Sequence, residues 1–283
     1  AMRMTKADVS AAQAWAVKAI SAGTMTSNDH IAAVTHTDGP EGINKNGHGE
    51  VFDVDSQMRL SATFESHLSG DPRLSVLFAP GSSNSVIVGM PNGSTSDTYV
   101  GTDGVSVPGV TDRHVYAQTH SALKGKDVPM VFQTYAEVEF LKAEAAIRGW
   151  ISSSAEEHYN KGVTAAMKML KQLYPASTAI TDAEISAYLA GPGAYDASKG
   201  WEMAMNEYWK ATFLNEYEAY ANWRRTGYPT LTPTKHPNSV SNNQIFRRMI
   251  YPGGESATNG DNYAAAVARQ GADDFTTRMW WDK

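Results

Sequence analysis

The 283-residue sequence contains no cysteine. This absence excludes a disulfide framework, a zinc or iron–sulfur site held by thiolates, and a cysteine nucleophile. It does not exclude an oxidising compartment, because such a compartment permits disulfides without requiring them.

Long apolar runs and blocks of like charge are also missing. No window holds about 18 consecutive apolar residues, so no membrane-spanning helix is expected, and the first residues lack the pattern of a signal peptide. The formal net charge is −6, from 24 Lys+Arg and 30 Asp+Glu. Nucleic-acid surfaces need clustered cations to neutralise phosphate, so no nucleic-acid partner is expected. One large or two small globular domains remain.

The common catalytic and cofactor motifs do not occur. There is no phosphate-binding glycine loop, no His-Glu-x-x-His and no Gly-x-Ser-x-Gly, and the eight histidines show no spacing suited to a metal. We therefore expect no catalytic residue, no metal site and no cofactor.

Two carboxylates in one helix could serve a glycosidase, since Glu137 and Glu144 lie about two turns apart. We favour a structural role. Consecutive Arg224 and Arg225 follow Trp223 before a Gly-Tyr-Pro turn, and planar guanidinium groups are suited to buried carboxylates.

The second half of the chain carries strong helical patterns, with capping residues, small residues facing large ones, and glycine or proline stops. Expected helices are 5–23, 56–68, 130–148, 154–173, 181–190, 199–222 and 262–270.

The segment between the early helices and residue 129 is rich in Gly, Ser, Thr, Asp and Pro. We expect loop over 24–54 with one short strand at most, and two β-like runs at 85–88 and 105–110. Long loops in a compact domain are usually functional or disordered. The aromatic stripe of 199–222 is interpreted as core packing, and Trp280 and Trp281 are expected to dock the C-terminal tail.

Several spaced blocks carry a family likeness. They are TYAEVEFLKAEAAIRGW at 134–150, AEEHYNKGV at 155–163, EAYANWRRTGYP at 218–229, RRMIYP at 247–252 with Glu255 and Asn259, DPRL at 71–74 and WWD at 280–282. In this order the blocks resemble the SusD/RagB-type nutrient-binding outer-membrane lipoproteins of Bacteroidetes, and they span most of the chain.

The resemblance implies a mainly α fold of tetratricopeptide-like helical hairpins with long irregular loop segments. It implies one SusD-like domain over 1–283, with a loop-rich ligand region at 24–128 and a helical core with a docked tail at 129–283. Members are longer and begin with a signal peptide and an acylated cysteine, so this sequence is expected to be N-terminally incomplete. Membrane contact is then expected only through a lipid anchor that lies outside it, on the extracellular face of the outer membrane.

The implied function is capture of oligosaccharides without cleavage and their delivery to a TonB-dependent, SusC-like transporter. Two alternatives from the residues stay open: a tetratricopeptide-like scaffold that binds protein, and a glycosidase that uses two carboxylates.

Sugar rings expose C–H faces, so their sites usually combine aromatic platforms with polar side chains for the hydroxyls. In the loop-rich region the candidates are Tyr99, Arg113, His114 and Tyr116, with Asp97 and Asn84 as polar partners. Tyr99 and Tyr116 could instead pack against the helices and hold the loop in place. Trp201 is an alternative platform.

Overall fold

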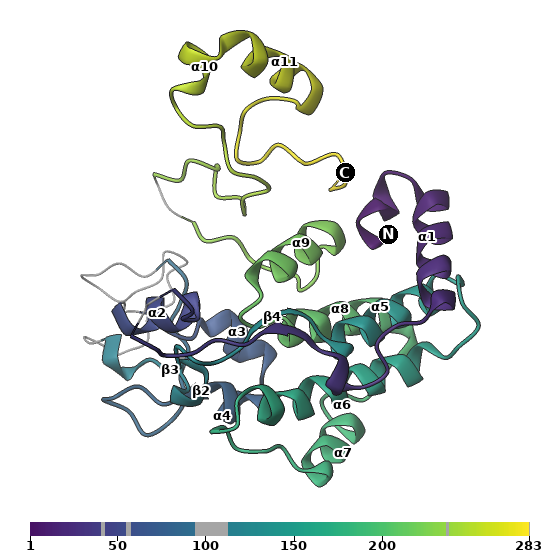
Figure 1. Ribbon diagram of the computed structural model, residues 1–283, viewed down its shortest axis with the longest axis vertical. Coiled ribbons are helices and arrows are strands. Elements are labelled where there is room, and N and C mark those ends of the chain that lie inside the picture. The colour runs from purple at the N-terminus through teal and green to yellow at the C-terminus, as the bar shows by residue number, and fades with distance from the viewer. Residues whose placement is uncertain (41–42, 55–57, 94–112, 236–237, 283) are drawn as a thin grey trace.

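The computed structural model describes residues 1–40, 43–54, 58–93, 113–235 and 238–282 (Figure 1). Helices dominate these residues, which confirms the expected mainly α class. The α-helices are α1 Val9–Ala22, α2 Gly47–Val54, α3 Ala62–His67, α4 Arg73–Leu77, α5 Tyr135–Ile147, α6 Ala155–Leu173, α7 Asp182–Ala190, α8 Gly200–Ala211, α9 Glu216–Thr226, α10 Glu255–Thr258 and α11 Gly260–Gln270. Short 3-10 helices are η1 Met2–Lys6, η2 Asn28–His30, η3 Arg113–Val115, η4 Ser121–Leu123 and η5 Ala197–Lys199.

Four short strands form two antiparallel pairs. In one, β1 (Ala32–Val34) pairs with β4 (Met130–Gln133), and in the other β2 (Phe78–Ala79) pairs with β3 (Gln118–Thr119). The first pair joins the loop-rich region to the segment that leads into α5, and the second joins two distant segments within that region.

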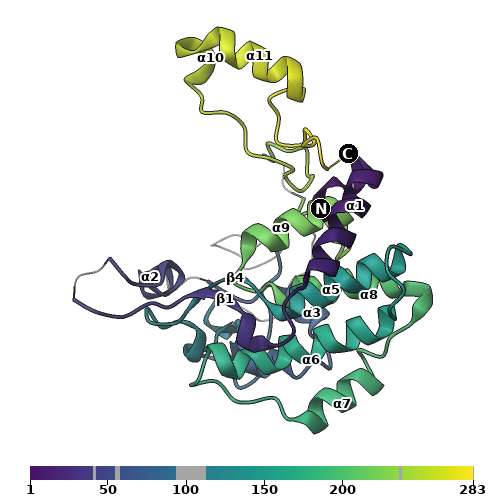
Figure 2. The same cartoon turned by 45° about the vertical axis from the view of Figure 1, so that its right-hand side comes forward.

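The helical hairpin α5–α6 forms the centre of the fold, and α8 packs against both helices (Figures 1 and 2). Small residues permit this packing. A Cβ built on Gly162 of α6 would lie 2.6 Å from a ring carbon of Phe140 of α5. Any larger side chain at Gly162 would therefore push the two helices apart.

Two expected helices differ from the structure. The helix expected at 130–148 begins as strand β4, because Thr134 caps α5 with its side chain and Glu137 completes the capping box. The helix expected at 199–222 is divided into α8 and α9, and Leu214 between them has a φ of 66°. After the break the stripe is no longer buried as a whole, because Tyr217 is 87% exposed whereas Trp223 is buried.

The loop-rich region also differs from expectation. Helix α2 occupies part of the expected loop 24–54, and the helix expected at 56–68 is only α3. Residues 85–88 form no strand, although Val88 accepts a hydrogen bond from the backbone of Ala117. The run 105–110 lies outside the described residues.

Helix α2 is held by specific contacts at both ends. The Asn46 side chain accepts hydrogen bonds from the backbone of His48 and Gly49, and Lys126 pairs with Asp53 at 2.6 Å. His48 Nε2 lies 3.1 Å from Glu216 Oε1, which joins α2 to the first residue of α9. This last contact raises the pKa of His48 and lowers the pKa of Glu216 through their shared hydrogen bond.

The C-terminal segment leaves the helical body, and α10 and α11 stand apart from it in both views (Figures 1 and 2). The chain then returns to the body. The Arg224 guanidinium lies 4.7 Å from the centre of the Trp281 ring, whereas Trp280 is 55% exposed. Asp282 is fully buried and faces Arg247, Arg278 and Lys6 at 3.2, 3.3 and 3.8 Å. One tryptophan and the following aspartate thus fix the tail.

A buried charge network joins α4, α7 and α8. Arg73 contacts both Asp71 and Glu207, and Lys210 contacts the same two carboxylates at 3.3 and 2.7 Å. Tyr188 of α7 donates to Glu207 at 2.7 Å. Burial alone would raise the pKa of Glu207, but the cations Arg73 and Lys210 outweigh it and lower that pKa to about 2.

We expect Lys210→Met to lower the free energy of unfolding by about 3–5 kcal/mol, because it removes one of the two cations that neutralise two buried carboxylates. The matched control is Lys168→Met, whose pair with Asp182 is exposed and should contribute less than about 1 kcal/mol. Chemical denaturation measures both. Equal losses would contradict the assignment of stability to the buried network.

The His48–Glu216 contact should stabilise the fold in a limited pH window. The His48 pKa is raised above 6.5, so its contribution is complete below that value and is lost as the pH rises through the folded-state pKa. The Glu216 pKa is lowered from 4.5, so its contribution is lost only in acid. We expect His48→Gln to lower the melting temperature more at about pH 5.5 than at about pH 8.5. A difference independent of pH would show that the contact is not an ion pair.

Candidate functional site

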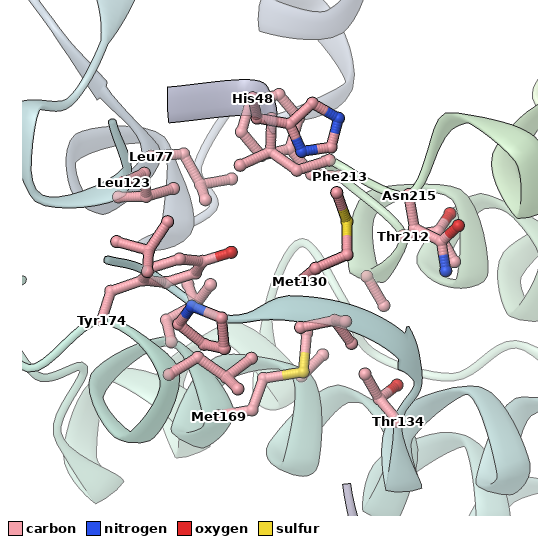
Figure 3. A pocket seen from close by; sticks show the side chains of 18 of the residues that line it. His48, Leu77, Leu123, Met130, Thr134, Met169, Tyr174, Thr212, Phe213 and Asn215 are labelled. Carbon is pink, nitrogen blue, oxygen red and sulfur yellow. The ribbon is translucent and has the colours of Figure 1, made fainter. Parts of the chain in front are cut away.

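A narrow cavity lies within the helical body. Figure 3 shows its lining, which gathers Met130, Met169, Tyr174 and Phe213 from segments far apart in sequence around one space. Its volume is about 30 Å³, which is room for little more than a water molecule. This cavity cannot hold a sugar ring.

A larger open groove shares His48 and Phe213 with that cavity, and we call it the α2–α8 groove. Its volume is about 430 Å³, within the usual range of ligand sites. The described lining residues are His48, Val51, Phe52, Met58, Arg59, Leu60, Ser61, Phe64, Phe78, Thr119, Trp209, Thr212, Phe213, Leu214, Glu216 and Ala219.

Aromatic rings form the floor of the groove. The Phe64 ring stacks on Phe213 with centres 5.5 Å apart and meets Trp209 edge-on at 4.8 Å. Phe78 meets Phe213 at 5.2 Å. Phe64 and Phe78 are buried, while Trp209, Phe213 and Phe52 are partly exposed. Contacts with this buried pair fix Trp209 and Phe213 in place, so this part of the groove is a preformed apolar surface.

Polar groups at the groove are already engaged by the protein. His48 is bonded to Glu216, and Arg59 donates to the carbonyls of Met58 and Arg113. The hydroxyl of Thr212 donates to the carbonyl of Tyr208. The charged side chains are therefore held in position around an apolar floor.

The structure brings some of the expected ligand residues together beside this groove. Asn84 donates to the carbonyl of Val115, which places it against the 3-10 helix η3 that carries Arg113 and His114. Arg59 lines the groove and lies 3.4 Å from His114 Nδ1. These residues border the groove on its loop side and are not among its lining.

Asp97, Tyr99 and Tyr116 were also expected to contact the ligand. Asp97 and Tyr99 lie outside the described residues. Tyr116 is fully buried, with no partner for its hydroxyl among the described residues. Its ring does not present the exposed face that a sugar platform needs, and the pinning role considered from the sequence describes it better.

Trp201 lies away from the groove. The guanidinium of Arg148 sits 4.5 Å from its ring centre and that of Arg225 sits 6.0 Å away. Its π-system is thus occupied by cations of the helix-end network. The alternative of Trp201 as a sugar platform does not agree with this arrangement.

The expected carboxylate–arginine network has a specific form. Arg225 donates two hydrogen bonds to Glu144, at 2.6 and 2.7 Å. Arg224 instead donates to the carbonyl of Arg247, whose guanidinium lies over Trp223. Glu137 accepts from Tyr208 at 3.2 Å, and its pKa is raised to about 7 because burial opposes its charge. These residues hold helix ends and do not line the α2–α8 groove.

The sequence analysis missed the residues that form the groove. Trp209 and Phe213 belong to the stripe interpreted as core, and Phe52 and His48 lie in a segment expected to be loop. The signal for the break was the run Thr212-Phe213-Leu214-Asn215, whose last residue is a frequent helix N-cap type.

The described ranges offer neither a metal site nor a membrane-spanning helix. They contain no cluster of His, Asp and Glu suited to a metal ion. None of their helices combines the length and apolarity that crossing a bilayer requires.

Solved structures with this fold are known. A chitin-binding protein is 30% identical, with a TM-score of 0.85 over all of this chain and 62% of its own. A SusD-like protein from Bacteroidetes is 25% identical, with a TM-score of 0.85 and 67% of its chain covered. A chitin-binding SusD homologue from Flavobacterium johnsoniae is 23% identical over all of this chain and 61% of its own, with a TM-score of 0.75. The present chain spans about three fifths to two thirds of these proteins.

The curated proteins contain no significant match to the sequence. A family model described as "Starch-binding associating with outer membrane" matches residues 1–252. This family and its structural neighbours are described as binding carbohydrate and not as enzymes. With this match over most of its length and the helical frame described above, the chain belongs to the SusD-like family.

Proposed function

We propose that the chain binds oligosaccharides without cleaving them, and that the ligand lies in the α2–α8 groove. The observation that carries this proposal is that three partly exposed aromatic side chains, Phe52, Trp209 and Phe213, line one groove, two of them against a buried aromatic layer. Such rings match the C–H faces of sugars. The chitin-binding neighbours and the starch-binding description of the family support the same ligand class.

The loop residues that border the groove also have a role in this proposal. Arg113, His114 and Asn84 lie beside the groove through their contacts with Arg59 and Val115. Loops near a rigid scaffold commonly contribute ligand contacts. We place them at the end of the bound glycan.

A glycosidase role has weak support. Hydrolysis requires two carboxyl groups on either side of one glycosidic bond. Glu144 is fully buried, and Arg225 occupies both of its oxygens. Glu216 is the single carboxylate among the described residues that line the groove.

The whole protein, as we propose it, delivers its glycan to a TonB-dependent, SusC-like transporter at the outer membrane. The family description of association with the outer membrane supports this place of action. A protein-binding scaffold is the alternative function, and binding of an unrelated peptide in place of any glycan would favour it.

Calorimetric titration with oligosaccharides tests the binding site. We expect Phe52→Ala to weaken the bound glycan about tenfold, because one stacking face is lost. The matched control is Tyr217→Ala, which removes an 87% exposed ring that lies close in sequence but does not line the groove. Equal weakening in both variants, or none in either, would place the ligand elsewhere.

The transport step is tested with the natural protein in its source membrane. We expect chemical cross-linking of that protein in intact outer membranes, followed by mass spectrometry, to identify a TonB-dependent β-barrel as its neighbour. Cross-links to periplasmic or cytoplasmic proteins alone would refute the transport proposal and leave glycan binding intact.

A further inference from the structure

Glu137 differs from the other buried carboxylates of the described residues, because no cation pairs with it. Its side chain is buried, at 2% exposure. Each of the others forms an ion pair with at least one lysine or arginine; they are Asp71, Glu139, Glu144, Glu207 and Asp282. Glu137 instead accepts hydrogen bonds from two neutral groups, the backbone N–H of Thr134 at 2.8 Å and the hydroxyl of Tyr208 at 3.2 Å. A buried charge is costly without a counterion.

Glu137 also lines an open pocket, which we call the α1–α5 pocket. Helix α1 lies against α5, and η1 lies against α9. These four segments surround a space of about 630 Å³, within the usual range of small-molecule sites. The pocket shares no described lining residue with the α2–α8 groove. It is therefore a separate site.

Much of the wall of the α1–α5 pocket is apolar. Helix α1 contributes Ala19 and Ile20, and α5 contributes Val138 and Leu141. Phe132 of β4 also lines the pocket, and its side chain is 60% exposed. Such a wall favours a ligand with a hydrocarbon body, because burial of apolar surface drives association.

The charges of the pocket leave one carboxylate uncompensated. The other charged side chains of the described lining all form ion pairs, namely Arg3–Glu218, Lys142–Glu139 and Arg225–Glu144. Burial is the main cause that raises the pKa of Glu137 to about 7, and the negative charge of Glu218 adds to it. A cation beside Glu137 would favour its charged form.

We propose that the α1–α5 pocket binds a small organic amine, whose ammonium group donates to Glu137 and whose apolar body packs between α1 and α5. The ammonium supplies the missing counterion, and its N–H groups suit carboxylate oxygens. A metal ion is a poorer occupant, since the described residues form no cluster of ligands for one. The volume has room for a whole small molecule, which favours a free amine over the lysine side chain of a partner protein.

Three ligands with the same six-carbon chain test the proposal: hexylammonium, hexanol and hexanoate. They differ in the charge of the head group. At about pH 8.5, where Glu137 is ionised, hexylammonium should bind about tenfold or more tightly than hexanol, because only its head group is a cation. Hexanoate should bind most weakly. NMR titration of the whole chain at constant ionic strength measures the three dissociation constants.

The preference for the ammonium should depend on pH. Below the Glu137 pKa of about 7 the carboxyl group becomes neutral, so at about pH 5.5 the preference over hexanol should fall to about twofold or less. The other titratable groups around it are Tyr208 on α8, whose pKa burial raises well above 10, and the ion pairs named above. A preference that is independent of pH in the wild-type chain would overturn the inference without any variant.

A variant of Glu137 and its control locate the site. Glutamine can keep the capping box at the start of α5, so Glu137→Gln removes the charge and preserves the cap. We expect it to abolish the preference for hexylammonium at about pH 8.5. The control Glu156→Gln removes an exposed carboxylate of α6 that does not line the pocket, and it should keep the wild-type preference. Thermal unfolding shows that both variants are folded.

Several outcomes would overturn the inference. They are equal binding of hexylammonium and hexanol, an unchanged preference in Glu137→Gln, and equal losses in Glu137→Gln and Glu156→Gln. Binding of a lysine-containing peptide by a chain that binds no free amine would also overturn it. None of these results bears on glycan binding, which concerns the α2–α8 groove.

Discussion

The buried network of Asp71, Arg73, Glu207 and Lys210 is the interaction on which the arrangement of the helices depends. Two carboxylates and two cations cancel their charges away from water. Buried ions are tolerated only when their partners are in place. Since these side chains come from the start of α4 and from α8, and Tyr188 adds α7, the network joins the three helices to one another.

Helix α8 connects this charge network to the groove. Lys210 and Trp209 are neighbours on α8, and successive residues of a helix point about 100° apart. Lys210 enters the charge network and lines the narrow cavity, whereas Trp209 lines the groove. The network that fixes Lys210 therefore also fixes the direction of Trp209. A polar contact on one face of α8 thus helps to orient the aromatic floor on the neighbouring face.

The sequence predicted the frame better than the site. The α5–α6 hairpin and the pairing partner of Glu144 follow from helix periodicity and from residue types that need each other when buried. The break between α8 and α9 does not follow, because it requires Leu214 to adopt a positive φ against its own preference. Helix α2 was missed for a related reason: its sequence, GHGEVFDV, has weak helical propensity, and it is held by Asn46, by Glu216 and by Lys126 from outside.

The helical frame and the α2–α8 groove are encoded by different parts of the sequence. Among the described residues that line the groove, only Ala219 falls within the sequence blocks that carry the family resemblance. The blocks build the hairpin, the helix-end network around Glu144 and Arg225, and the docked tail. The groove is built where α2 and the α8–α9 break meet. A change of Phe52 or Phe213 alters the surface offered to a sugar without touching the charges that hold the helices. Phe64 and Phe78 also belong to the hydrophobic core, and Trp209 and Phe213 pack against it, so most of the aromatic groove surface is set by side chains that the helical frame itself requires.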